Sequence, residues 1–378
     1  MAMGIKGMVR RGLMVALAAG MMGLLGCGPK PAATPATPST EIHIYNWSDY
    51  IEQSILDDFT KETGIKVVYD TFDSPEILET KVLTGGTGYD IVVPSNQYVP
   101  RLIMAEALQP LDRNQLSNFG NLWPQIMTYM DPFDPGAKYA VPYMWGTVGI
   151  GYNRAAVARA LPGVNIDSWD VVFKPENLAR LKDCGVYFLS DAQDMYGAVM
   201  RSMGKDPNST NPADYQAATD LLMRLRPYIR KFSNSEYIDA LANGDICIAI
   251  GYSGDVLQAA DRAEEAKNGV QLAYVVPKEG SQVWFDSFVI PKDAPHPDAA
   301  LKFINYMLRP DVIARASNYL HYANANSAAT PKLDPEVRDD PNVYPTPAIF
   351  AGLFVVKPKS QELLREINRQ WTKVTTGQ

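Results

Sequence analysis

The chain has 378 residues, of which 46% are hydrophobic and 20% are charged, and its formal net charge at pH 7 is −7. This composition is typical of a folded globular protein, and the acidic balance argues against a nucleic-acid-binding surface. The sequence contains 3 histidines, none of them in a metal-ligand spacing, so we expect neither a metal nor another cofactor.

Residues 1–26 have the pattern of a lipoprotein signal peptide. Lys6, Arg10 and Arg11 form a basic start, and the apolar run 13–25 is too short to cross a bilayer comfortably. The run ends in Leu-Leu-Gly-Cys, which resembles a bacterial lipobox. We therefore predict that Cys27 is acylated and becomes the N-terminus; an ordinary secretory peptide or a signal anchor is the alternative.

Residues 27–40 are rich in Pro, Ala and Thr, which predicts an extended tether between the lipid and a globular part. Removal of the signal peptide takes away three cations and no anion, which changes the net charge from −7 to −10. The chain from Glu41 onward is long for one hydrophobic core and suits two. We expect an extracytoplasmic protein held at a membrane by its lipid, with no second membrane segment.

Cys184 and Cys247 remain when Cys27 carries the lipid. Export places both in an oxidising compartment, where leftover thiols often pair. We predict a Cys184–Cys247 disulfide; two separate buried thiols are the alternative.

After the tether, strands and helices alternate. Hydrophobic patterning with Gly and Pro boundaries predicts strands at 42–45, 65–69 and 90–93, and helices at 54–62, 75–83 and 98–108. This order is typical of a parallel, doubly wound sheet. In such sheets ligands bind beyond the carboxyl ends of the strands.

The middle of the chain changes character. Residues 138–152 are extended and glycine-spaced, which suits a crossing between two lobes, and 283–290 read as the return crossing. Further strands are predicted at 186–189 and 246–250, and helices at 213–225, 298–307, 311–317 and 361–374. We assign residues 41–147 and 284–330 to lobe 1, and residues 148–283 and 331–378 to lobe 2.

Three stretches place aromatic rings beside a carboxylate, each near a predicted strand end. They are Trp47-Ser48-Asp49-Tyr50, Tyr252-Ser253-Gly254-Asp255 and Trp284-Phe285-Asp286. Ring faces and carboxylates both attract cations, so stretches that converge would form a cage for an organic ammonium ion. The ordinary alternative is that the rings fill cores and the acids cap helices.

Asp191 and Asp194 follow the strand at 186–189. One of them is explained as a helix cap, because a carboxylate accepts N–H bonds at a helix start, and the other is then free for a ligand. Two neighbouring carboxylates are also compatible with the active site of a carboxylate-dependent hydrolase. The sequence contains no nucleophile motif, however, and we expect no catalytic residue.

Six longer motifs resemble the polyamine-binding proteins of ABC importers, in particular the putrescine-binding branch. They are IYNWSDYI (44–51), YDIVVPSNQYV (89–99), CGVYFLSDAQDMY (184–196), NGDICIAIGYSGDV (243–256), WFDSFVIPKDA (284–294) and HYANANSAATP (321–331). The resemblance implies a two-lobed α/β fold of the type II periplasmic binding class. Each lobe would be a mixed, mostly parallel sheet flanked by helices, and the lobes would be joined by two hinge crossings.

The resemblance also implies the pocket residues and the disulfide. With the aromatic and acidic stretches above, the predicted ligand-binding set is Trp47, Ser48, Asp49, Tyr50, Ser95, Asp191, Asp194, Tyr252, Asp255, Trp284, Asp286 and Tyr322. Asp286 is expected to anchor a terminal ammonium.

Some of these positions depart from the putrescine-binding branch. That branch has Trp where this chain has Tyr252, and Glu where it has Asp194. Asp191 and Trp284 are more like the spermidine-preferring branch, whereas the putrescine branch is matched by Ser48, Asp49 and Asp255. The amine is therefore predicted only as putrescine, spermidine or both, with agmatine or cadaverine as alternatives.

The resemblance predicts a monomer that binds a polyamine and delivers it to the transmembrane subunits of an ABC permease. Three other functions stay open on the sequence: a sensor subunit that uses the same cleft, the hydrolase, and a metal-binding relative of the same fold. The aromatic cage suits an organic cation better than a hard metal ion.

Overall fold

The computed structural model describes residues 39–378. The predicted signal peptide, the acylation of Cys27 and the tether up to residue 38 lie outside the described residues. Within residues 39–378, no helix is long and apolar enough to cross a membrane.

The first lobe is built on three parallel strands in the order β2-β1-β3, connected by helices as predicted. The helix α1 ends at Gly64, whose φ of 73° is accessible to glycine at little cost. The predicted βαβαβ unit is confirmed by β1 (Glu41–Trp47), α1 (Gln53–Thr63), β2 (Lys66–Phe72), α2 (Pro75–Thr84), β3 (Ile91–Val92) and α3 (Val99–Met104). Four later elements complete this lobe: α4 (Pro124–Met130), α12 (Pro297–Met307), α13 (Pro310–Leu320) and β10 (Ala323–Asn324).

The second lobe repeats the scheme with parallel strands in the order β6-β5-β7. Its strands are β5 (Val186–Phe188), β6 (Lys231–Phe232), β7 (Ile248–Tyr252) and the outlying β8 (Leu272–Val275). Its helices are α5 (Arg154–Ala160), α6 (Asp170–Phe173), α7 (Pro175–Leu181), α8 (Ala192–Ser202), α9 (Pro212–Leu225), α10 (Tyr237–Ala242), α11 (Ser253–Ala266) and α16 (Gln361–Thr376).

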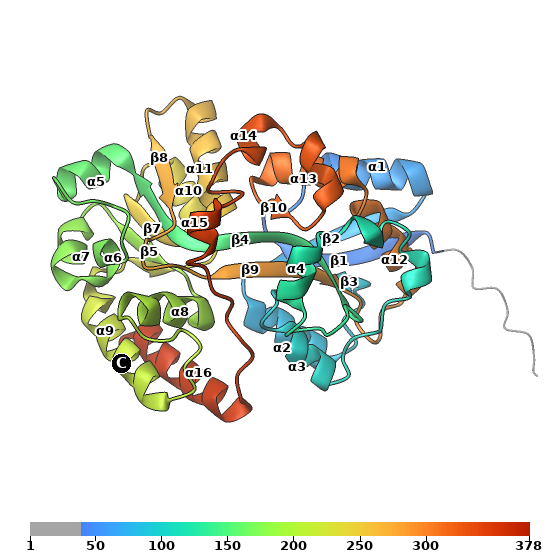
Figure 1. The fold of residues 1–378 in the computed structure, drawn as a ribbon, viewed down its shortest axis with the longest axis horizontal. Coiled ribbons are helices and arrows are strands. Elements are labelled where there is room, and N and C mark those ends of the chain that lie inside the picture. The colour runs from blue at the N-terminus through green and yellow to red at the C-terminus, as the bar shows by residue number, and fades with distance from the viewer. Residues whose placement is uncertain (1–38) are drawn as a thin grey trace, which may run out of the picture. The chain divides into compact units, whose positions relative to one another are not determined.

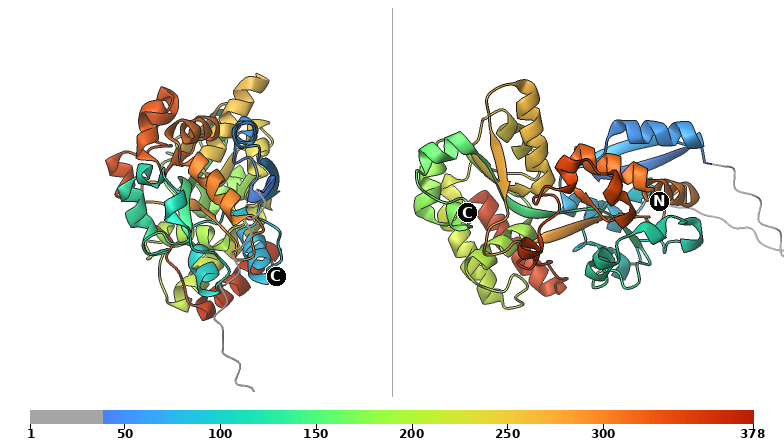
Figure 2. Two further views of the ribbon diagram at one scale, coloured as in Figure 1. Left: turned by 90° about the vertical axis from the view of Figure 1, so that its right-hand side faces the viewer. Right: turned by 45° about the horizontal axis from the view of Figure 1, so that its top comes forward.

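Two long antiparallel strands, β4 (Ala140–Asn153) and β9 (Val283–Val289), join the two parallel sets into one sheet (Figure 1). The first part of β4 pairs with β9 and β10, and its last part with β7 and β8. Both predicted crossings are therefore confirmed. Figure 2 shows the two lobes side by side, with these strands between them.

The C-terminal segment makes a further connection, which the assignment of residues 331–378 to lobe 2 implies, although no element was predicted for it before residue 361. After α14 (Pro335–Arg338) and α15 (Pro347–Phe350), Phe354 bonds to the start of β9, and α16 then packs on α9 of the second lobe. The segment lacks a hydrophobic period, so no sequence pattern indicated its path. The lobe boundaries predicted from the sequence stay a prediction.

One expectation about the aromatic and acidic stretches is wrong. Trp47 ends β1 and Tyr252 ends β7, as predicted, but Trp284 and Asp286 lie inside β9. The reason is that β9 pairs with β4 from Val283 onward, so Trp284 and Asp286 line the cavity from within the strand.

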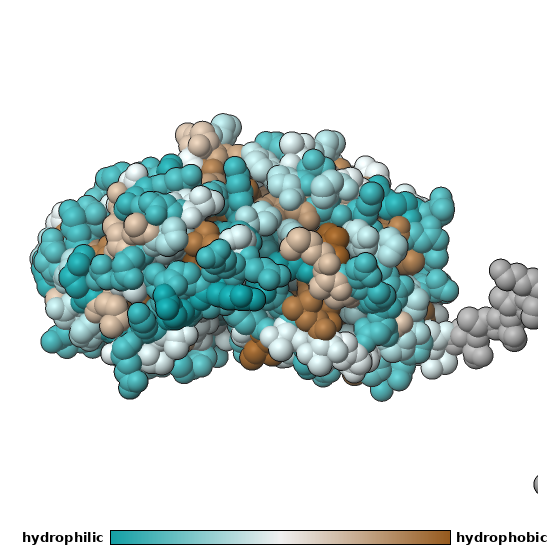
Figure 3. Space-filling view, turned by 90° about the horizontal axis from the view of Figure 1, so that it is seen from below, coloured by the Kyte–Doolittle hydropathy of each residue, from teal (hydrophilic) through white to brown (hydrophobic). Residues whose placement is uncertain are grey.

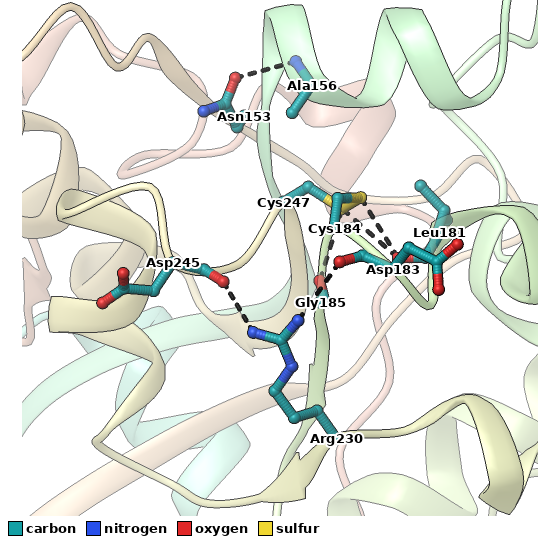
Figure 4. Close-up of a disulfide and its surroundings, with 9 residues drawn as sticks. All are labelled: Asn153, Ala156, Leu181, Asp183, Cys184, Gly185, Arg230, Asp245 and Cys247. Atoms are coloured by element: carbon teal, nitrogen blue, oxygen red, sulfur yellow. Dashed lines mark hydrogen bonds between the residues drawn. A yellow bond between two sulfur atoms is a disulfide. The ribbon is translucent and has the colours of Figure 1, made fainter.

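Cys184 and Cys247 form the predicted disulfide, with Cα atoms 5.4 Å apart (Figure 4). It joins β5 to β7 just before the two strands pair. Arg230 reinforces this junction, because its guanidinium donates to the carbonyl oxygens of Asp183 and Asp245. The bond therefore fixes the register of the two strands that lead to the second lobe's half of the interlobe boundary.

Large apolar side chains are mostly buried in the two lobes, and few are exposed among the described residues. Figure 3 shows one face of the molecule, which is largely hydrophilic with small, separated apolar patches. Small, scattered apolar patches are common on the surfaces of folded domains.

Candidate binding cleft

A cavity lies between the two lobes and brings together eleven of the twelve residues predicted from the sequence. These are Trp47, Ser48, Tyr50, Ser95, Asp191, Asp194, Tyr252, Asp255, Trp284, Asp286 and Tyr322. They come from both lobes and from the crossing strand β9. The cavity therefore exists only where the lobes meet.

The fold explains why these positions converge. β1 and β7 end at the boundary between the lobes, so the residues after them face the cavity. A helix follows each of these strands in the chain. Asp255 lies in the first turn of α11, directly after β7. Asp191 caps α8 by accepting the N–H of Asp194, at 2.9 Å. Asp191 is thus the predicted cap, but Asp194 is not left free, because it accepts hydrogen bonds from Tyr252 and Gln282.

Asp49 is the exception, because it does not line the cavity. Its backbone is left-handed, with φ 52°, and its carboxylate lies 3.2 Å from a guanidinium nitrogen of Arg262 in α11. About half of the Asp49 side chain is exposed. The structure therefore gives Asp49 an ion pair at the rim between the lobes, and its expected place among the ligand contacts is not supported by the geometry.

Aromatic rings form one wall of the cavity. Tyr252 and Tyr322 both meet Trp284 edge-on, with ring centres 5.6 and 5.2 Å apart, and Tyr50 meets Tyr322 at 5.5 Å. Rings packed in this way are held rigid by one another. They offer a preorganised apolar surface for methylene groups and a negative ring face for a cation.

Asp286 is the carboxylate with the fewest partners. It is buried and accepts a hydrogen bond from the Ser95 hydroxyl at 2.5 Å. Burial raises the pKa of Asp286 to about 7, the nearby carboxylates of Asp194 and Asp255 add to the rise, and the Ser95 bond opposes it. An added positive charge would restore the ionised form.

Asp194 and Asp255 are also buried, but the protein itself supplies them with donors. Tyr252 and Gln282 donate to Asp194 at 2.9 and 2.7 Å, and Gln97 donates at 3.4 Å. Burial still raises the pKa of Asp194 to about 6 against these hydrogen bonds.

Tyr237 and Tyr322 both donate to Asp255 at 2.6 Å, and burial raises its pKa to about 6 as well. Asp191 accepts from the Tyr98 hydroxyl at 2.9 Å. Burial, together with the charge of Asp194, raises the pKa of Asp191 well above its usual value. Four acidic groups thus share one enclosed space.

Several polar atoms of the lining are buried without a hydrogen-bond partner among the described residues. They are the indole N–H groups of Trp47 and Trp284, the hydroxyl of Tyr50 and the side-chain oxygen of Gln97. Unpaired buried polar atoms are costly, so their concentration here indicates a space shaped for a polar ligand. No group of three or more His, Cys, Asp or Glu within residues 39–378 is arranged to hold a metal ion.

Five lining residues were missed by the sequence reasoning: Asp73, Gln97, Asn234, Ser235 and Ile238. Asp73 follows β2, so the rule that ligands lie beyond strand ends could have found it. Gln97 is two residues from Ser95 in the same turn. Nothing in the sequence marked the other three, which reach the cavity from the loop after β6 and from α10.

The chain matches the family model of bacterial extracellular solute-binding proteins over residues 54–346. It is 51% identical to the "Putrescine-binding periplasmic protein PotF" of Escherichia coli over 347 residues. This alignment covers 91% of this chain and 94% of that protein. It is 44% identical over 358 residues to the "Putrescine-binding periplasmic protein SpuD" of Pseudomonas aeruginosa, covering 94% of this chain and 98% of that protein.

Solved structures agree with this match. A putative spermidine/putrescine ABC transporter from Listeria monocytogenes is 36% identical, with a TM-score of 0.80 over 90% of this chain and all of that one. The spermidine/putrescine substrate-binding protein PotD from Streptococcus pneumoniae is 32% identical, with a TM-score of 0.73 over 90% of this chain and 99% of that one. The predicted two-lobed fold of the type II periplasmic binding class is confirmed. The chain belongs to the bacterial extracellular solute-binding protein family.

Proposed function

We propose that this protein captures a polyamine, putrescine or spermidine or both, in the interlobe cavity and delivers it to an ABC permease. The observation that carries the proposal is the enclosed set of buried carboxylates beside rigid aromatic rings, contributed by both lobes. An alkyl chain with ammonium ends matches this arrangement, because rings hold methylenes and carboxylates hold ammonium groups. Binding and delivery, not a chemical reaction, are the expected activity.

The charges suggest how the ligand drives closure. At neutral pH and above, an empty closed cavity would hold several repelling carboxylates, which disfavours closure. A polyamine brings compensating positive charge only where the lobes meet. It therefore has a higher affinity for the closed form and shifts the equilibrium toward it.

Asp286 is proposed as the anchor for one terminal ammonium. Its only hydrogen bond at a measured distance comes from Ser95, and the Tyr50 hydroxyl lies close enough to oppose the rise of its pKa. Among the described residues, the Trp284 indole N–H in the same lining has no partner. Asp255 and Asp194 are proposed to receive the positive charge further along the chain of the ligand. A neutral isostere would leave these groups unpaired and should be rejected.

The length of the amine is a separate question. Relatives are named for putrescine, for putrescine and agmatine, and for spermidine and putrescine. Asp191 adds a fourth carboxylate beside Asp194 and is fully buried. We propose that this pair could hold a further ammonium of spermidine, so that the cavity accepts both a diamine and a triamine.

The location of the protein follows from the same family membership and from the first residues. We propose an extracytoplasmic monomer, tethered by lipid on Cys27, with the Pro-, Ala- and Thr-rich segment 27–40 between the membrane and the folded lobes. Mass spectrometry of the membrane-extracted protein tests the acylation. A Cys27→Ser variant should lose the lipid and be released into the soluble fraction.

Isothermal titration calorimetry with putrescine, spermidine, spermine, agmatine and cadaverine tests the proposed ligand. We expect saturable binding of at least one polyamine and none of 1,4-butanediol, the neutral analogue of putrescine. Thermal stabilisation should rise with ligand concentration as the dissociation constant requires. Uptake of the bound amine by cells with and without the gene then separates a transport subunit from a sensor.

A further inference from the structure

Three consecutive residues of the first lobe contact one face of α11 in the second lobe. The Leu320 carbonyl accepts from the Gln258 side chain at 3.1 Å, and His321 Nε2 lies 2.7 Å from a carboxylate oxygen of Asp261. Tyr322 donates to Asp255 at 2.6 Å. Positions 255, 258 and 261 are three residues apart, so they lie close together along one face of the helix.

The backbone at His321 is unusual. It ends α13 in the left-handed region, with φ 54°, where a side chain is disfavoured and glycine is usual. α1 and α16 end in the same conformation with Gly64 and Gly377. Lys267 ends α11 in the same conformation, so what distinguishes His321 is its contact with Asp261.

Tyr322, the next residue, has little freedom. A Cβ built on Gly254 would lie 2.6 Å from its ring, and one built on Gly146 would lie 3.0 Å from it. The ring also meets Trp284, and the hydroxyl accepts from the backbone N–H of Asp255 at 3.1 Å. The direction in which the chain leaves α13 therefore decides whether this ring and hydroxyl reach the cavity.

We infer that His321 and Asp261 are positioning residues for the ligand: their contact holds the turn 320–322 on α11, and so places Tyr322 against Asp255 and Trp284. Neither residue lines the cavity. Because α13 and α11 belong to different lobes, the contact forms as the lobes meet and adds to the affinity of the closed form. The inference rests on the proposed amine-binding function.

The test is a His321→Gly variant, which removes the imidazole and also relieves the left-handed backbone. We expect the variant without ligand to melt at the temperature of the unaltered protein or above it, because glycine accepts this conformation. We expect its affinity for putrescine to fall only about fivefold, with faster dissociation, because the Asp261 side chain is half-exposed and such ion pairs are weak. A residue with a purely structural role would instead lower the melting temperature.

Lys267→Gly is the matched control. Lys267 ends α11 in the same left-handed conformation, with φ 51°, but it is exposed and does not line the cavity. This variant should keep the affinity of the unaltered protein. Asp261→Ala should weaken binding as much as His321→Gly does, and the double variant should be no worse than either single one.

The outcomes separate the two claims. If the unaltered protein binds putrescine and His321→Gly binds it within twofold of the same affinity, the positioning role is wrong while the proposed function stands. Independent, additive losses from His321→Gly and Asp261→Ala also overturn the positioning role. If the unaltered protein binds no amine in calorimetry, the proposed function is wrong and the inference falls with it.

Discussion

Asp286 and Asp194 are both buried in the same cavity, yet the protein treats them differently. Asp194 receives hydrogen bonds from Tyr252, Gln282 and Gln97, whereas Asp286 receives one from Ser95. The pKa of Asp194 is about 6 and that of Asp286 about 7. Burial raises both pKa values, but the protein supplies three donors to Asp194 and one to Asp286, so Asp286 keeps more capacity for a ligand. The affinity of the site should therefore depend more on Asp286.

The largest expected effect tests this difference directly. Replacing Asp286 by Ala should weaken the binding of putrescine by about 2–5 kcal/mol, because it leaves a buried ammonium without its carboxylate. Asp194→Ala is the matched variant and should cost less, since the lost charge is partly held by protein donors. Calorimetry on both variants measures the two costs. Equal affinity of Asp286→Ala and the unaltered protein, or a larger loss from Asp194→Ala, would contradict the comparison.

The pH dependence of binding is expected to follow Asp286 before Asp194. An ammonium binds the ionised carboxylate, and the pKa of Asp286 in the empty cavity is about 7. As the pH falls through 7 and then through 6, first Asp286 and then Asp194 and Asp255 become protonated, so affinity is lost toward acid and is fully present only well above pH 7. Asp191, whose pKa burial also raises, adds to this loss.

Protonation of Asp286 alone should lower the affinity more than tenfold between pH 7.5 and 5.5. Binding below pH 7 should also release protons, which calorimetry detects as a dependence of the heat on the buffer. In an Asp286→Asn variant the step near pH 7 should vanish while the step near pH 6 remains. A flat affinity between pH 5.5 and 7.5 would refute the assignment.

Gly254→Ala probes the donor that Asp255 receives from Tyr322. The new methyl group would meet the Tyr322 ring at 2.6 Å, so the ring must move and its hydroxyl loses Asp255. We expect about tenfold weaker binding, in line with the cost of overpacking a tight site. Gly120→Ala is the control, because a Cβ there meets nothing within 4 Å. Unchanged affinity in Gly254→Ala would show that the Tyr322 contact is dispensable.

Asp49 is expected to have the smallest effect. Its carboxylate faces Arg262 at the rim and is half-exposed, and such ion pairs contribute little. Asp49→Asn should therefore weaken putrescine binding less than about fivefold, and the loss should shrink as salt is added. A loss of affinity as large as that of Asp286→Ala would show that Asp49 contacts the ligand directly.

Local patterns were sufficient for much of the fold. The alternating strands and helices of the first lobe and the two crossings were predicted, because hydrophobic period and glycine and proline positions act over short distances. The disulfide was predicted because only two cysteines remain once Cys27 carries the lipid. The path of the C-terminal segment through Phe354 has no such period. The extent of β9 was predicted as 283–290, so the error for Trp284 and Asp286 concerns only which part of this strand borders the cavity.

The candidate site divides in the same way. Residue chemistry alone pointed to rings and carboxylates that would suit an organic cation, and most of these side chains do surround one cavity. It could not separate Asp49 from its neighbours Ser48 and Tyr50, because a left-handed turn and the distant Arg262 decide where that carboxylate points.

The groups that can bind a cation, and most of the strands that bring them to the cavity, are recognisable in the amino-acid sequence. The number of donors that each buried acid receives, and therefore which acid is left for a ligand, depends on long-range packing. The physical reason is that burial and hydrogen bonding of a carboxylate depend on side chains such as Gln282, Tyr322 and Tyr98, which reach it from elements far apart in the chain.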